Sequence, residues 1–213
     1  MALIRYFRKI AYLIVAIGIS SANAGSFDDF FIAIRNDNTS ILGGLLQRGF
    51  DPNTADEKGQ PGLTTAMQER SLRAAKLLLE QPTLNIDALN QAGESALMMA
   101  ALKGEIDGAK MLLDRGAKIN QSGWSPLHYA AAGPEPELVR LLLVHGAEVD
   151  AASPNGTTAL MMAAQYGSED SVKLLLDRGA DPSRRNVRDL SASDFAKLAG
   201  RDALARALQK LQR

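Results

Sequence analysis

The chain has no cysteine, few aromatic residues and no surplus of charge of either sign. The absence of cysteine excludes disulfides, thiolate zinc sites and cysteine nucleophiles. The 213 residues include 24 basic and 24 acidic ones, so net charge gives no reason to expect a nucleic acid as partner. Aromatic residues make up 5% of the chain and hydrophobic residues 46%, so the apolar content is mostly alanine and leucine. This composition favours thin, closely packed helices over a bulky core.

The residue patterns that carry chemistry are missing as well. The two histidines, His128 and His145, belong to no cluster with metal-binding spacing, and there is no acidic loop of the calcium-binding type. No serine stands in a Gly-x-Ser-x-Gly turn, and no glycine-rich loop has the pattern that holds a phosphate. The sequence therefore predicts no enzyme activity, no metal site and no cofactor.

Residues 1–24 are typical of a secretory signal peptide. Arg5, Arg8 and Lys9 form a basic start, residues 10–19 are apolar and uncharged, and the segment ends in Ala22-Asn23-Ala24. We expect cleavage after Ala24 and export of residues 25–213 to a bacterial periplasm, or secretion. The alternative is an uncleaved membrane anchor, but the apolar run is shorter than the roughly 20 residues that span a bilayer. No stable membrane anchor is expected after cleavage.

Residues 155–181 predict a turn, a short helix, a second turn and a second short helix. The first helix is small on one side and is broken by Gly167, and the second ends at Gly179. Neither helix is long enough to be stable alone in water, so the unit needs copies of itself as neighbours. The sequence supplies them, because Leu127 and Leu160 are 33 residues apart and Leu97 precedes Leu127 by 30.

Residues 123–131, Gly-Trp-Ser-Pro-Leu-His-Tyr-Ala-Ala, closely resemble the Gly-x-Thr-Pro-Leu-His-x-Ala-Ala signature of ankyrin repeats. The resemblance covers residues 26–213 and is most specific between residues 88 and 183. It implies an all-α solenoid of about six helix-turn-helix units with short hairpin fingers, in one domain spanning residues 25–213. The expected units, of which the first and last act as caps, are 26–57, 58–87, 88–120, 121–150, 151–183 and 184–213.

Several local features agree with such a fold. Ser95, Ser125 and Thr158 are suited to cap the first helix of their units, and glycines after the second helices supply left-handed C-terminal caps. Three residues are missing between Asn120 and Leu127 relative to the next unit. The finger of residues 121–150 is therefore expected to be short.

In ankyrin proteins the usual partner surface is the concave side, made of the fingertips and the exposed ends of the first helices. The motif histidine of this family, here His128, is usually structural. For Trp124 an alternative interpretation is that it covers the shortened finger and fills the gap. The positions that the resemblance assigns to partner binding are Gln68, Glu94, Leu102, Lys103, Trp124, Thr157, Gln165 and Tyr166.

The predicted function is non-catalytic binding of another protein by a monomer in the periplasm. One hypothesis is an accessory or protective factor for a periplasmic enzyme. A second is an immunity protein that neutralises a toxin in the periplasm, and a third is a secreted effector that binds a host protein.

Overall fold

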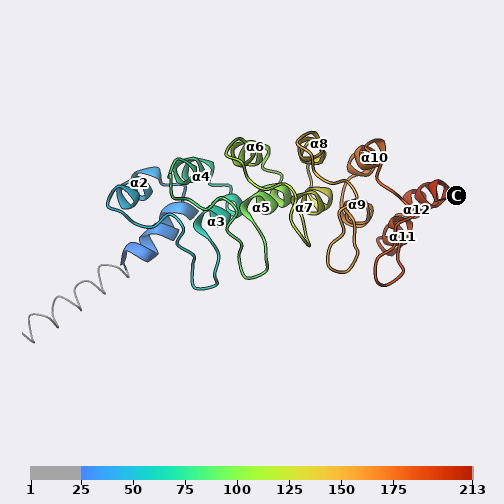
Figure 1. Ribbon diagram of the computed structural model, residues 1–213, viewed down its shortest axis with the longest axis horizontal. Helices are drawn as coiled ribbons and strands as arrows, with labels where there is room; N and C mark the ends of the chain where they lie inside the picture. Colours follow the sequence, from blue (N-terminus) through green and yellow to red (C-terminus); the bar gives the residue numbers. More distant parts are fainter. Residues whose placement is uncertain (1–24, 213) are drawn as a thin grey trace, which may run out of the picture.

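The computed structural model describes residues 25–212, which form an elongated stack of paired helices (Figure 1). The predicted signal peptide lies outside the described residues. Residues 25–35 are helical and pair with α2 (Thr39–Gln47). The pairs that follow are α3 (Gly62–Gln68) with α4 (Leu72–Leu79), α5 (Ala96–Lys103) with α6 (Ile106–Asp114), α7 (Pro126–Ala132) with α8 (Pro136–Val144), α9 (Ala159–Tyr166) with α10 (Glu169–Asp177), and α11 (Ala192–Leu198) with α12 (Asp202–Leu211). The predicted all-α solenoid is confirmed, and β pairing within the described residues amounts to one isolated bridge, between Ala55 and Pro61.

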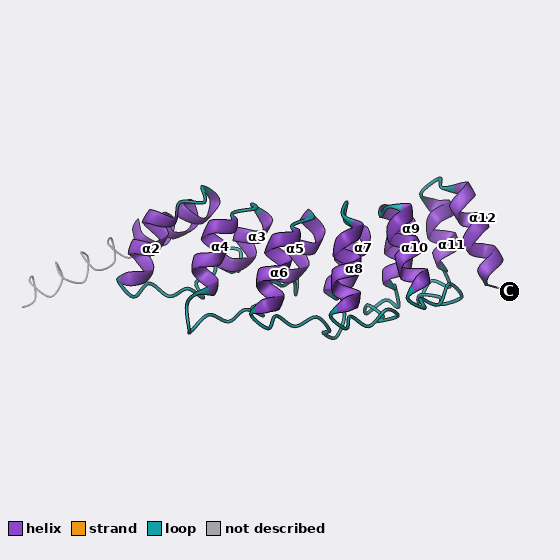
Figure 2. Ribbon diagram, turned by 90° about the horizontal axis from the view of Figure 1, so that it is seen from above, coloured by secondary structure: helices purple, strands orange, loops and turns teal. Residues whose placement is uncertain are grey.

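The helices form two rows. The odd-numbered helices α3 to α11 make an inner row, the even-numbered helices an outer row, and the long loops, called fingers here, project on the inner side (Figure 1). Seen from above, the pairs stand side by side along the stack (Figure 2). Successive inner helices pack more closely than successive outer helices. The inner side is therefore the concave side.

Small residues allow the inner helices to approach this closely. The alanine pairs at the ends of α5, α7 and α9 are all buried. A Cβ atom added to Gly167 would lie 2.1 Å from the carbonyl oxygen of Ala131, and one added to Gly133 would lie 2.8 Å from that of Ala101. Successive inner helices thus meet backbone to backbone.

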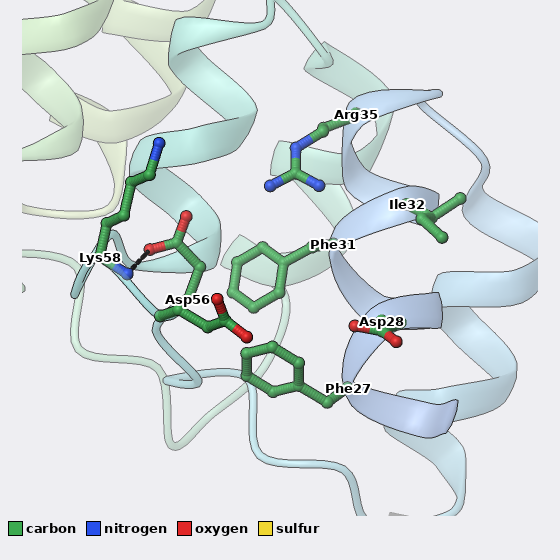
Figure 3. Close-up of a pocket in the computed structure, with 8 residues that line it drawn as sticks. Phe27, Asp28, Phe31, Ile32, Arg35, Asp56 and Lys58 are labelled. Atoms are coloured by element: carbon green, nitrogen blue, oxygen red, sulfur yellow. Dashed lines mark hydrogen bonds between the residues drawn. The ribbon is translucent and has the colours of Figure 1, made fainter. Parts of the chain in front are cut away.

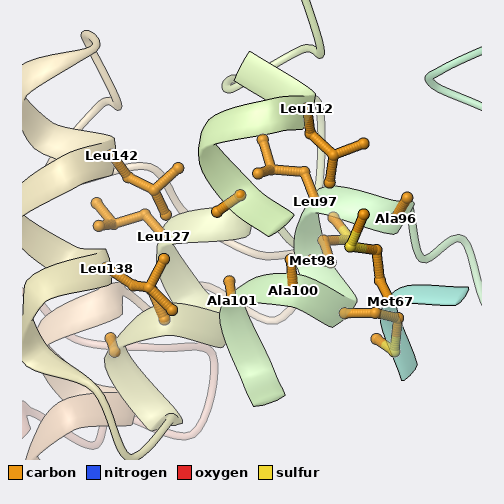
Figure 4. Close-up of a cluster of buried hydrophobic side chains, with 14 of the residues drawn as sticks. Met67, Ala96, Leu97, Met98, Ala100, Ala101, Leu112, Leu127, Leu138 and Leu142 are labelled. Atoms are coloured by element: carbon orange, nitrogen blue, oxygen red, sulfur yellow. The ribbon is translucent and has the colours of Figure 1, made fainter. Parts of the chain in front are cut away.

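Leucines fill the space between the two rows. Leu97, Leu112, Leu127, Leu138 and Leu142 are fully buried and lie beside one another across two units (Figure 4). Burial of one such side chain contributes roughly 1.5–3 kcal/mol. Because helices α2 to α12 are only seven to ten residues long, this packing between units, rather than helix propensity, holds the helices together.

Two of the three predicted helix N-caps, Ser95 and Thr158, are present, whereas the Ser125 hydroxyl lies 2.9 Å from Nδ1 of His128. The Oγ atom of Ser95 accepts a hydrogen bond from the Met98 amide at 3.3 Å, and Oγ1 of Thr158 accepts one from the Met161 amide at 3.4 Å. The glycines after three of the outer helices, Gly116, Gly146 and Gly179, have φ angles of +83°, +90° and +85°. This left-handed conformation closes the C-terminal turn at little steric cost only with glycine.

Hydrogen bonds join the base of each finger to the base of the next. Side-chain oxygens of Asn53, Asp87, Asn120 and Asp150 accept hydrogen bonds from backbone amides 28 to 32 residues further along, at 2.7–3.1 Å. From this residue to the helix N-cap the chain advances eight positions before α9, from Asp150 to Thr158, but only five before α7, from Asn120 to Ser125. The finger before α7 reaches less far than its neighbours (Figure 1), as predicted.

Candidate protein-binding surface

Equivalent side chains form rows across the concave face, because the inner helices stack in the same register. The N-caps that fix this register are Pro61, Ser95, Ser125, Thr158 and Ser191. The row just before the N-cap is Gln60, Glu94, Trp124, Thr157 and Leu190. The row four positions after it is Thr65, Met99, Tyr129, Met162 and Phe195, and the row seven positions after it is Gln68, Leu102, Ala132, Gln165 and Leu198.

An apolar hollow of about 250 Å³ lies where these rows cross α5, α7 and α9. Trp124 packs edge-on against the His128 ring, with 5.2 Å between ring centroids, and is half-buried. Trp124 therefore packs against α7, and it also forms one wall of the hollow. The lining residues are Leu102, Trp124, His128, Tyr129, Ala132 and Met162.

His128 is the buried floor of this hollow and is structural, as expected. Its Nδ1 atom accepts a hydrogen bond from the Ser125 amide at 3.1 Å, so its Nε2 atom carries the proton and donates it to the Thr157 carbonyl at 2.9 Å. Burial lowers the pKa of His128, although its hydrogen bonds to backbone carbonyls act in the opposite direction. The neutral ring therefore locks the finger of the next unit onto α7.

A chain of polar side chains covers the N-terminal part of the concave face. The Tyr129 hydroxyl donates to Oε1 of Glu94 at 3.0 Å, and Nδ2 of Asn90 donates to the other Glu94 oxygen at 2.8 Å. Asn90 also donates to Oε1 of Gln60 at 2.9 Å, and Gln60 donates to Oε1 of Gln68 at 2.9 Å. Burial, and then the Glu94 carboxylate, raise the pKa of Tyr129 well above its ordinary value. These side chains therefore already hydrogen-bond to one another in the absence of a partner.

The structure brings some of the predicted site residues together and separates others. Leu102 and Trp124 share the hollow, and Lys103 follows Leu102 at the end of α5. Gln165 is half-buried and Tyr166 is 62% exposed at the end of α9, outside the hollow. Gln68 and Glu94 belong to the polar chain described above.

Thr157, which the family resemblance assigns to partner binding, is buried. Its side chain is only 2% exposed. The Thr157 amide donates to Oγ of Ser153 at 3.0 Å and its carbonyl accepts from His128, so the finger turn draws the residue inward. Sequence reasoning also missed Tyr129 and Met162 as surface residues. Their shared position, four residues after the N-cap, was the signal that could have found them.

A second hollow, of about 380 Å³, lies at the N-terminal end between residues 25–35 and the finger before α3 (Figure 3). Phe27 and Phe31 form one wall, and Arg35 lies over the Phe31 ring at 5.8 Å. Asp56 faces them, but its carboxylate holds the finger turn by accepting from the Lys58 amide at 2.9 Å. Charges of both signs surround this hollow, so it is less suited to an apolar anchor than the one beside Trp124.

The described residues contain neither a group of metal-binding side chains nor a membrane-spanning helix. Among residues 25–212, no three histidine, aspartate or glutamate side chains are grouped so that they could hold a metal ion. In the same range, no helix has the length and apolar character needed to cross a bilayer.

Stacked helix pairs with projecting fingers define a helical repeat protein. The chain belongs to the ankyrin-repeat family: the family described as "Ankyrin repeats (3 copies)" matches residues 30–122 and 116–186. Ankyrin repeats are a protein–protein interaction fold, and no enzyme family is indicated by the comparisons.

Relatives are found in bacteria and animals. An ankyrin repeat-containing protein of Treponema pallidum is 28% identical over 173 residues, which are 81% of this chain and 48% of that protein. The rat protein "Ankyrin repeat and SAM domain-containing protein 6" is 32% identical over 147 residues, 69% of this chain and 13% of that protein. The chain thus spans about half or less of the length of these curated relatives.

Two solved structures share the fold closely. One is a chain in the structure of the Bdellovibrio bacteriovorus predatory endopeptidase Bd0816 in complex with immunity protein Bd3460. It has a TM-score of 0.74 and 28% identity, and the match covers 85% of this chain and 97% of that chain. The other is the ankyrin repeat domain of Bcl-3, with a TM-score of 0.71, 30% identity and coverage of 85% and 81%.

Proposed function

We propose that this protein acts by binding one protein partner on its concave face, without chemistry of its own. The observation that carries the proposal is the apolar hollow beside Trp124, open at the centre of an otherwise pre-ordered face. Tryptophan and tyrosine at the centre of an interface contribute most of the binding energy in many complexes. The backbone contacts between inner helices make the face rigid, so a partner loses little affinity to reordering it.

The test removes the walls of the hollow one at a time. Trp124→Ala is expected to weaken capture of the partner from periplasmic extract by on the order of 30-fold. Tyr166→Ala, on the exposed end of α9, is expected to weaken capture less. Val144→Ala is the matched control, because Val144 is 64% exposed on the outer helix α8. If capture by the folded Trp124→Ala variant equals that by the control, the assignment to the concave face is wrong.

We propose the periplasm as the place of action, on the basis of the signal pattern in residues 1–24. The mature protein should then begin at Gly25. Mass spectrometry of the protein from its native cell measures this directly. An intact Met1 in the soluble fraction would contradict export.

Two roles follow from the same binding face. The first is an accessory or protective factor for a periplasmic enzyme. The second is an immunity protein that neutralises a toxin, and it is supported by the similarity to a chain in a complex of an endopeptidase with its immunity protein. Adding the purified protein to its captured partner separates the two: a protected enzyme keeps its activity longer, whereas a neutralised toxin loses activity in a one-to-one complex.

A further inference from the structure

The concave face is divided along its length into a polar part and an apolar part. The polar part is the hydrogen-bonded chain from Gln68 to Tyr129. The mainly apolar part continues from α5 to α11, with Gln165 of α9 as a polar member, and Leu198 at its far end is 64% exposed. The residues of this apolar stripe are Leu102, Trp124, Tyr129, Met162, Phe195 and Leu198.

The apolar stripe offers almost nothing for a partner's backbone to bond with. Leu102, Phe195 and Leu198 have no hydrogen-bonding groups in their side chains, and the Met162 sulfur is a weak acceptor. The Tyr129 hydroxyl already donates to Glu94, which leaves the Trp124 indole N–H as the remaining side-chain donor of the stripe. An extended segment laid here would bury unpaired N–H and C=O groups, whereas an α-helix pairs its backbone internally. The stripe therefore favours a helix over a strand.

The spacing of the stripe also fits a helix. Packed helices lie about 8–10 Å apart, and seven residues of an α-helix advance about 10.5 Å. A partner helix running across the inner row would therefore present one apolar position to each inner helix every seven residues. Contact from α5 to α11 takes three such steps, or about 20 residues of helix.

Both ends of the stripe carry positive charge without a partner. Lys103 follows Leu102 at the end of α5, and Arg188 stands exposed at the tip of the finger before α11. Within residues 25–212 neither side chain takes part in an ion pair. Two carboxylates close to them in the sequence are engaged, since Glu105 pairs with Arg70 at 3.0 Å and Asp189 pairs with Arg185 at 3.6 Å.

We infer that the partner protein docks an amphipathic α-helix on the apolar stripe, with apolar residues repeating every seven positions and carboxylates near Lys103 and Arg188. This inference rests on the proposed function, because it names the chemistry of the partner for the same face. The helix fills the hollow beside Trp124 with one large side chain and lays its apolar side on Met162 and Leu198.

A displayed library of random 21-residue peptides, selected on the purified protein, tests the inference. Enriched peptides should carry apolar residues seven apart, with others three or four apart, and a net negative charge. Their affinity should fall by on the order of 30-fold for Trp124→Ala and stay unchanged for the outer-helix control Val144→Glu. Selection on the double variant Lys103→Glu, Arg188→Glu should enrich basic peptides instead. Circular dichroism confirms that each variant is folded.

Other results of the selection would contradict the inference. Peptides with proline or with apolar residues two apart, peptides of the same charge on both proteins, or no enrichment at all would contradict the inferred helix. If capture of the native partner still depends on Trp124 in those cases, the proposed function stands and only this inference fails. If neither the peptides nor the native partner depend on Trp124, both are wrong.

Discussion

Replacing Gly167 by alanine measures how closely α7 and α9 approach each other. Gly167 ends α9 with φ −86° and ψ −177°, which is extended backbone that any residue adopts. The added methyl group therefore causes no backbone strain. Its obstacles are the Ala131 carbonyl oxygen, which would lie 2.1 Å from the new Cβ atom, and the Cα and carbonyl oxygen atoms of Ala163, at 3.0 and 3.2 Å.

The sign of the change in stability distinguishes this close contact from the usual effect of replacing glycine by alanine. At an unobstructed position with compatible backbone angles, glycine to alanine stabilises by roughly 0.4–1 kcal/mol. Here two backbones must separate, and overpacking of this kind costs about 1–3 kcal/mol. For a chain of this size, each kcal/mol lowers the melting temperature by about 2–4 °C. We therefore expect Gly167→Ala to melt about 2–12 °C lower than the natural protein.

The matched control is Gly43→Ala in α2. A Cβ atom there meets only the Leu77 Cδ2 atom, at 3.5 Å, which is normal contact distance. Because alanine is the better helix former, this change should stabilise the protein by up to about 1 kcal/mol. Thermal and urea unfolding followed by circular dichroism measure both variants. If Gly167→Ala is as stable as Gly43→Ala, the inner helices do not meet backbone to backbone.

Two further predictions concern the interior. Nη1 of Arg201 donates to three carbonyls at the end of α9 at 2.9–3.0 Å. Arg201→Ala should therefore lower the free energy of unfolding, measured in urea, by about 1.5–3 kcal/mol. A decrease of less than about 0.5 kcal/mol would contradict this role. Because burial lowers the pKa of His128, the unfolded chain takes up a proton at a higher pH, near 6.5, than the folded protein does. Stability is then full above that pH and falls by up to about 1.4 kcal/mol per pH unit below it. His128→Gln should remove this dependence of the free energy of unfolding on pH between pH 7.5 and 5.5. An unchanged dependence would show that another group causes it.

The repeat architecture and its caps were predictable because their signals are local. A serine or threonine at the N-cap and a glycine after the second helix act within one turn of the chain. The short finger before α7 was predictable by counting from Asn120 to Leu127, since a repeat protein supplies its own reference. The structural role of His128 followed from the motif it belongs to.

The composition of the site was predictable only in part. Trp124 and Leu102 were identified because their repeat positions usually face a partner. Thr157 has the same position as Trp124, but its side chain is buried, because the finger turn at Ser153 and the His128 ring draw it inward. Arg201 gave no signal, since its three acceptors lie 34 to 38 residues earlier in the chain.

The sequence by itself determined the unit, its period, its caps and the face that points inward. These depend on turn residues and on the spacing of leucine, alanine and glycine along one chain segment. Tertiary structure decided which side chains of that face remain accessible. A hollow exists beside Trp124 because a finger three residues shorter lies between α5 and α9, and because Tyr129 is held by Glu94 from the preceding unit. Accessibility depends on neighbours about 30 residues away, so only the stacked structure determines it.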